Sequence, residues 1–100
     1  IPVMRRADYQ RNLMRERRAR LAKAIELQEL QHGKMDARTR KRFEKDITQR
    51  WSQAQQEFLK KKGRLTWAQR NAARREFWDM IDKNLEKNIQ AEKAKKLQKR

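Results

Sequence analysis

Helix-breaking residues are almost absent from this chain, and their positions divide it into long uninterrupted segments. Pro2 is the only proline, and Gly33 and Gly63 are the only glycines among 100 residues. The segments between them are rich in Ala, Leu, Arg, Lys, Gln and Glu, which are the better helix formers. No alternation of apolar and polar residues indicates a strand. The sequence therefore predicts an all-α fold of three long helices joined by short, glycine-containing turns.

Local signals set the expected bounds of these helices. Asp8 and Asp36 are good N-cap residues, and Thr66 with Gln69 has the pattern of a capping box. Gly33 fits the left-handed residue that often ends a helix. We expect one small domain over residues 1–100, with helices at about 8–31, 36–62 and 66–90. A basic C-terminal tail with little to bury is expected over 91–100.

Apolar residues at helical spacing predict which faces pack. The second helix carries a stripe of large apolar side chains and one alanine: Phe43, Ile47, Trp51, Ala54 and Phe58. The buried face expected of the third helix contains Ala73, Phe77, Met80, Ile81 and Leu85. In the first helix, apolar residues are dense only after Leu21, so we expect its second half to pack and its first half to be a cationic rod.

The arrangement of the helices follows from short connections and a small core. Short turns make consecutive helices antiparallel neighbours. Only 36% of the residues are hydrophobic, which favours an extended shape. We expect an open three-helix bundle or an extended helical hairpin with a third arm. Trp51 and Trp78 lie on apolar stripes and are expected in the core, whereas Trp67, at the start of a helix, is expected to be partly exposed.

Positive charge is spread over the whole chain. Lys plus Arg number 29 against 13 for Asp plus Glu, which gives a formal charge of +16. Residues 1–33 contribute +4, residues 34–64 contribute +7 and residues 65–100 contribute +5. A basic tail on a neutral domain would not distribute in this way, and such a charge favours a polyanionic partner. No apolar run approaches the ~20 residues that span a bilayer, so no transmembrane segment is expected.

The basic side chains gather along each expected helix, and Arg is prominent among them. The planar guanidinium matches the geometry of phosphate, so an Arg-rich face suggests phosphate contact. The expected nucleic-acid-binding residues are Arg11, Arg15, Arg17, Arg18, Arg20, Arg38, Arg40, Lys41, Arg42, Arg50, Lys60, Lys61, Lys62, Arg64, Arg70, Arg74 and Arg75.

Candidates for catalysis or metal binding are few. There is no cysteine, and His32 is the only histidine. Asp79, Asp82 and Glu86 share one face of the third helix, where carboxylates could hold Mg²⁺ with help from acidic residues of the second helix. The alternative is a mixed-charge surface paired with neighbouring lysines, and His32 beside a glycine at a helix end is commonly structural. We therefore expect neither a catalytic site nor a metal or other cofactor.

Short motifs in the first half resemble the C-terminal toxin modules of polymorphic bacterial toxins, of the Rhs-type and contact-dependent-inhibition classes. They are Ile1-Pro2-Val3-Met4 with Ala7-Asp8-Tyr9, the turn Leu30…His32-Gly33-Lys34-Met35, and Phe43…Asp46-Ile47. The chain has Tyr9 where those modules carry His. The resemblance implies a nucleic-acid-damaging domain that an acidic immunity protein neutralises.

Three functions are thus open at the level of the sequence. The first is a non-enzymatic nucleic-acid-binding protein, with RNA preferred over DNA, as in a component of a ribonucleoprotein particle. Long Arg-rich helices that order on structured RNA fit this reading, because no helix-turn-helix or zinc-finger spacing is found. The second is the toxin domain. The third is a helical adaptor for an acidic protein surface.

Overall fold

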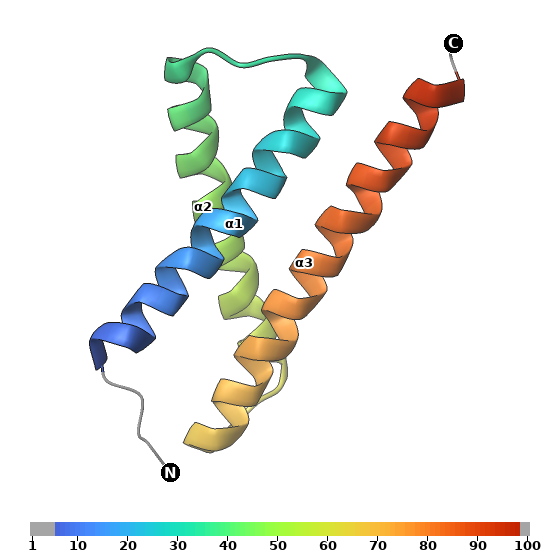
Figure 1. Ribbon diagram of the computed structural model, residues 1–100. Coiled ribbons are helices and arrows are strands. Elements are labelled where there is room, and N and C mark those ends of the chain that lie inside the picture. Colours follow the sequence, from blue (N-terminus) through green and yellow to red (C-terminus); the bar gives the residue numbers. More distant parts are fainter. Residues whose placement is uncertain (1–5, 99–100) are drawn as a thin grey trace.

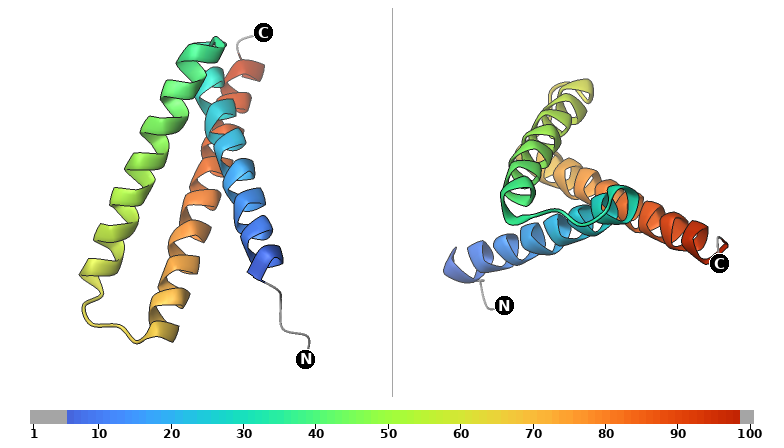
Figure 2. Two further views of the ribbon diagram at one scale, coloured as in Figure 1. Left: turned by 90° about the vertical axis from the view of Figure 1, so that its left-hand side faces the viewer. Right: turned by 90° about the horizontal axis from the view of Figure 1, so that it is seen from above.

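The computed structural model describes residues 6–98, which form three helices (Figure 1). They are α1 (Arg6–His32), α2 (Ala37–Lys61) and α3 (Trp67–Gln98), with no strand in this range. Helix α2 runs antiparallel to both of its neighbours, so α1 and α3 are parallel (Figures 1 and 2). The predicted all-α fold with three helices is confirmed.

The predicted end signals hold at the two turns on either side of α2. Gly33 and Gly63 have φ values of +91° and +78°, in the left-handed region that favours glycine. The Asp36 carboxylate caps α2 by accepting a hydrogen bond of 2.8 Å from the Thr39 backbone N–H. At the start of α3, the backbone N–H of Thr66 donates to Gln69 Oε1 at 2.9 Å, and that of Gln69 donates to Thr66 Oγ1 at 3.2 Å. This reciprocal pair is the capping box.

Two bounds differ from those expected. Helix α1 begins at Arg6, so Asp8 lies in the first helical turn, where the helix dipole also favours a negative charge. Helix α3 continues to Gln98, so the part of the expected tail up to that residue is helical. An ion pair of 3.3 Å between Lys93 and Glu26 ties this extension to α1. Residues 99–100 lie outside the described range.

The core lies where the middle of α1 meets α2 and α3. Ala24, Trp51 and Leu85, one from each helix, form its buried centre. Partly buried apolar residues surround them: Leu21, Leu27, Phe43, Ile47, Trp78 and Ile81. The rings of Trp51 and Trp78 meet edge to face with centroids 6.1 Å apart, as expected for core residues. Because α1 is exposed from residue 7 to residue 19, its first half is the cationic rod that the sequence predicts.

The buried row of α3 explains why Met80 is not in the core. Ala73, Phe77, Leu85 and Ile89 are buried and lie at multiples of four residues from one another. Residues spaced by four drift slowly around a helix of 3.6 residues per turn, so such a row can contact one neighbouring helix at one end and another at the other end. Met80 lies off this row and is 52% exposed, which corrects the expected buried face.

The apolar stripe of α2 is covered unevenly. Trp51 is buried, and the flanking Phe43, Ile47 and Phe58 are half-buried. Ala54 is exposed, which corrects the stripe expected from the sequence.

The molecule is elongated, with extents of 52 × 31 × 28 Å and a radius of gyration of 16.5 Å. A compact domain of this length would have a radius of gyration of about 13 Å. The open bundle that the sequence suggests is the arrangement found. Within the described residues, no helix is both long and apolar enough to cross a membrane.

Candidate nucleic-acid interface

A stripe of arginines follows the exposed half of α1. Arg11, Arg15 and Arg18 are spaced four and three residues apart, which places them on one side of the helix. All are exposed, and none pairs with an acidic side chain among the described residues. The three guanidinium groups therefore point into solvent together.

Helix α2 carries a matching stripe. Arg38, Arg42 and Lys45 have the same spacing and are also exposed and unpaired within the described residues. They lie on the side of α2 opposite Trp51, because the buried stripe occupies the other half of the helix. Lys45 is absent from the residues predicted to bind, although its spacing from Arg38 could have identified it.

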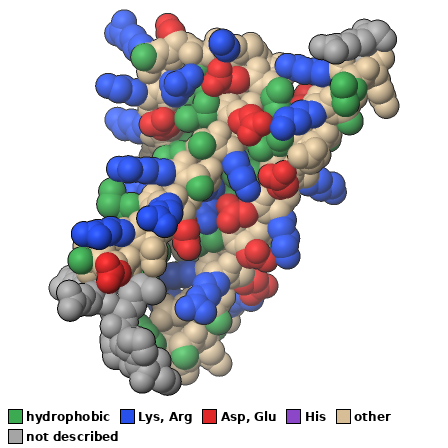
Figure 3. Space-filling model, in the orientation of Figure 1, with side chains coloured by type: hydrophobic (Ala, Val, Ile, Leu, Met, Phe, Trp, Pro, Cys, Tyr) green, Lys and Arg blue, Asp and Glu red, His purple; other side chains and the backbone are tan. Residues whose placement is uncertain are grey.

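The charges of both signs are distributed unequally over the surface. Figure 3 shows Lys and Arg projecting along the left-hand edge, over α1 and α2, whereas Asp and Glu lie among basic residues along the seam between α1 and α3. Ion pairs cross this seam between Arg20 and Asp82, Lys23 and Glu86, and Glu26 and Lys93. From Arg20 onward the seam is thus largely neutralised.

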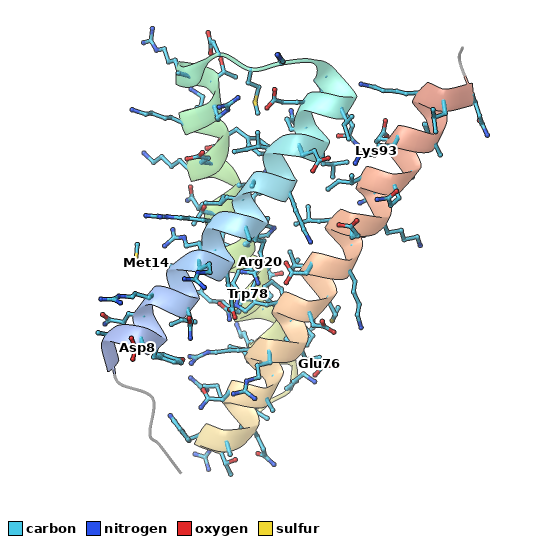
Figure 4. The ribbon with its side chains drawn as sticks, in the orientation of Figure 1. Asp8, Met14, Arg20, Glu76, Trp78 and Lys93 are labelled. Carbon is cyan, nitrogen blue, oxygen red and sulfur yellow. The ribbon has the colours of Figure 1, made fainter. Side chains whose placement is uncertain are left out.

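Arg20 is the clearest correction to the predicted binding residues. Its Nε donates to Asp82 Oδ1 at 2.8 Å and its Nη2 to Oδ2 at 3.2 Å. The guanidinium lies 4.3 Å from the centroid of the Trp78 ring, and the side chain is only 10% exposed (Figure 4). Because its donors and its planar face are both engaged, Arg20 joins α1 to α3 and is withdrawn from phosphate.

Two further predicted residues have partners within the protein. Arg40 pairs with Glu29 of α1 at 3.4 Å, and Lys62 pairs with Glu76 of α3 at 3.3 Å. Lys62 also lies 4.9 Å from the centroid of the Phe58 ring. The other predicted cations are exposed and make no ion pair with any acidic side chain of residues 6–98: Arg11, Arg15, Arg17, Arg18, Arg38, Lys41, Arg42, Arg50, Lys60, Lys61, Arg64, Arg70, Arg74 and Arg75.

The acidic face of α3 is used for ion pairs. Asp82 meets Arg20, Asp79 meets Lys83 at 3.0 Å, and Glu86 meets Lys23 at 3.5 Å. A hydrogen bond from Gln90 and the charge of Lys23 hold the pKa of Glu86 below its ordinary value, so this carboxylate is ionised at neutral pH.

The remaining acidic and histidine candidates do not form a metal-binding group within residues 6–98. Residues 6–98 contain no group of three or more His, Asp or Glu that could hold a metal ion, so Glu44 and Asp46 of α2 do not complete a site with the α3 carboxylates. His32 lies exposed in the last turn of α1, where a basic group faces helix carbonyls.

A groove between the first halves of α1 and α3 was not foreseen from the sequence. It has a volume of about 980 Å³ and lies on the N-terminal side of the Arg20–Asp82 pair. Tyr9 and Leu13 of α1 and Trp67 of α3 line it together with arginines of α3. Single-helix periodicity could not show this groove, because it forms between segments far apart in the sequence.

Comparisons with protein-family models, curated proteins and solved structures find no match. The resemblance to toxin modules therefore stays a hypothesis. Of the residues that carry it, Ile1-Pro2-Val3-Met4 lie outside the described range, and Tyr9 and His32 lie at opposite ends of α1. The function has to be argued from the charged surface and the groove.

Proposed function

We propose that this protein binds nucleic acid, with RNA preferred over DNA, and that the two outward cationic stripes contact phosphates. The stripes are Arg11, Arg15 and Arg18 on α1, and Arg38, Arg42 and Lys45 on α2. The observation that carries the proposal is the separation of charges. Asp82, Glu86 and Glu26 are engaged with cations at the α1–α3 seam, whereas the six residues of the stripes are exposed and make no ion pair within residues 6–98.

The chemistry of the stripes supports phosphate as the ligand. Guanidinium groups donate two parallel hydrogen bonds to phosphate oxygens, and releasing counterions from a polyanion adds to the affinity. A formal charge of +16 also accelerates encounter with a polyanion.

The arrangement of helices supports RNA over a groove-reading mode on duplex DNA. A helix-turn-helix unit joins two helices at about 90–120°. Here consecutive helices are antiparallel (Figure 2), and the spacing of the stripe residues places them along the sides of these long helices. Cationic stripes on such helices can contact the phosphate backbone of a nucleic acid without reading its base sequence. Recognition of a structured RNA by its shape depends on contacts of this kind.

Removing one stripe tests the proposal. Arg38, Arg42 and Lys45 are all changed to Gln, and binding to a structured RNA and a duplex DNA is titrated over a range of salt concentrations. Because each lost phosphate contact lowers the salt slope by about one, we expect a slope shallower by about 2–3 and weaker binding at moderate salt.

A matched control removes the same charge from α3. Lys83, Lys87 and Lys95 are exposed and are changed to Gln together. A stripe variant that binds with the slope of this control would refute the role of the stripe. Cleavage of the RNA in Mg²⁺ would instead favour the toxin domain, and failure of the wild type to bind any nucleic acid would favour an acidic protein as partner.

A further inference from the structure

The groove between α1 and α3 displays aromatic rings that the core does not use. Trp67 is 81% exposed and Tyr9 is 56% exposed, and both line the groove. The other two tryptophans are covered and pack against each other. Trp67 thus adds almost nothing to the packing of the bundle, although a solvated indole is unfavourable.

Trp67 is held on a rigid element. It is the first residue of α3 and lies between Thr66 and Gln69, the two residues of the capping box. Because the capping box fixes the backbone on both sides, the Cα of Trp67 is held at a defined place beside the groove, and a ligand does not have to order this backbone in order to meet the ring.

Arginines lie near Trp67 in the sequence and beside it along the groove. Arg64 and Arg70 are three residues away on either side, and Arg74 and Arg75 line the groove with Trp67. All four are exposed and make no ion pair among the described residues.

The acidic side chains that face the groove leave this positive charge in excess. They are Glu16, Asp79 and Asp82. Asp82 is bound by Arg20 and Asp79 by Lys83. Among the acidic side chains of the groove, Glu16 therefore has no ion pair within residues 6–98. Its single negative charge faces the two unpaired positive charges of Arg74 and Arg75.

We infer that this groove is a binding site for unpaired nucleotides of a single-stranded segment, with Trp67 and Tyr9 stacking on bases and Arg74 and Arg75 holding the adjoining phosphates. Every base has an aromatic face, but in a duplex that face is covered by its neighbours, so only unpaired nucleotides can enter. The inference rests on the proposed binding of nucleic acid and adds a second mode to it: the stripes hold backbone, and the groove selects unpaired bases.

The test compares two probes, a blunt-ended RNA duplex of two strands and the same duplex with an eight-nucleotide single-stranded overhang. We expect the wild type to bind the overhang probe more tightly. In Trp67→Ala the affinity for the overhang probe should fall by about 5- to 150-fold, the range for one lost base–aromatic stack. The affinity for the blunt duplex, the salt slope and the melting temperature of the protein should not change. Trp67→Phe should retain much of the preference.

Met14→Ala and Leu97→Ala serve as controls, because both side chains are exposed and neither lines the groove (Met14 is labelled in Figure 4). Equal affinities of wild type and Trp67→Ala for the overhang probe would overturn the inference, and so would an equal loss on both probes. In the first case the groove is left for a helix of a protein partner. The stripe variant distinguishes the two proposals, since its loss of binding to the blunt duplex does not depend on Trp67.

Discussion

The contact between Arg20 and Asp82 should contribute measurably to stability, unlike most ion pairs of this protein. Two parallel hydrogen bonds of 2.8 and 3.2 Å join the groups. Hydrogen bonds to charged groups contribute about 1.5–3 kcal/mol, whereas exposed ion pairs contribute about 0.2–1 kcal/mol. The Arg20 side chain is 10% exposed and that of Asp82 is 42% exposed. Because solvent screens one end of the pair, we expect a coupling free energy between these limits, about 1–2 kcal/mol.

A double-mutant cycle measures this coupling. Arg20→Met, Asp82→Asn and the double variant are unfolded in urea without nucleic acid, and the coupling is the departure of their free energies of unfolding from additivity. Arg20→Met alone should cost about 0.5–1 kcal/mol more than Asp82→Asn, since it also removes the cation from the Trp78 ring. The matched cycle uses Lys83 and Asp79, whose side chains are 78% and 63% exposed, and should give less than about 0.5 kcal/mol.

Salt separates the two cases further. In 1 M NaCl the screening length is about 3 Å, so the Lys83–Asp79 coupling should vanish while most of the Arg20–Asp82 coupling remains. A coupling no larger than that of the exposed pair, or one abolished by salt, would refute the reasoning. Arg20 would then belong with the free cations that can contact phosphate.

Two other predictions concern the core and the cap of α2. Phe77→Ala should lower the free energy of unfolding in urea by about 3–5 kcal/mol, because Phe77 is 4% exposed and its ring centroid lies 5.7 Å from that of Phe58. Met80→Ala should lower it by less than about 1 kcal/mol. Equal losses in the two variants would contradict the assigned core. Hydrogen bonds from Thr39 lower the pKa of Asp36, so its stabilising effect should be present above the unfolded pKa of about 3.9 and lost as pH falls through the lower folded value. The melting-temperature difference between wild type and Asp36→Ala should therefore shrink below about pH 4. The difference between Asp36→Asn and Asp36→Ala should stay the same at all pH values, because the Asn side chain does not titrate.

The features that the sequence predicts correctly depend on neighbouring residues. The capping box needs only Thr66 and Gln69, and the turn after α1 needs only Gly33. The stripe containing Trp51 follows from spacing within one helix, as does the exposed first half of α1. Such signals act within about one or two helical turns, so they can be recognised without a tertiary structure.

The missed features depend on contacts between distant segments. Arg20 looks like every other arginine in its cluster until Asp82, 62 residues away, is placed beside it. Tyr9 and Trp67 form one groove only because α1 and α3 are parallel. Met80 fails as a core residue because the crossing of three helices, not periodicity alone, selects the row that is buried.

The more extensive packing of α1 against α3 than against α2 has a consequence for when the protein can fold. The Arg20–Asp82 contact closes a loop of 62 residues. By the logarithmic dependence on length, this costs roughly 2 kcal/mol more chain entropy than closing a turn of about five residues. Before α3 is synthesised, α1 can pack only against α2, where its contact is smaller. We therefore expect α1 to dock only after α3 has been synthesised. Folding should accordingly occur in one late step and more slowly than in bundles whose contacts are local.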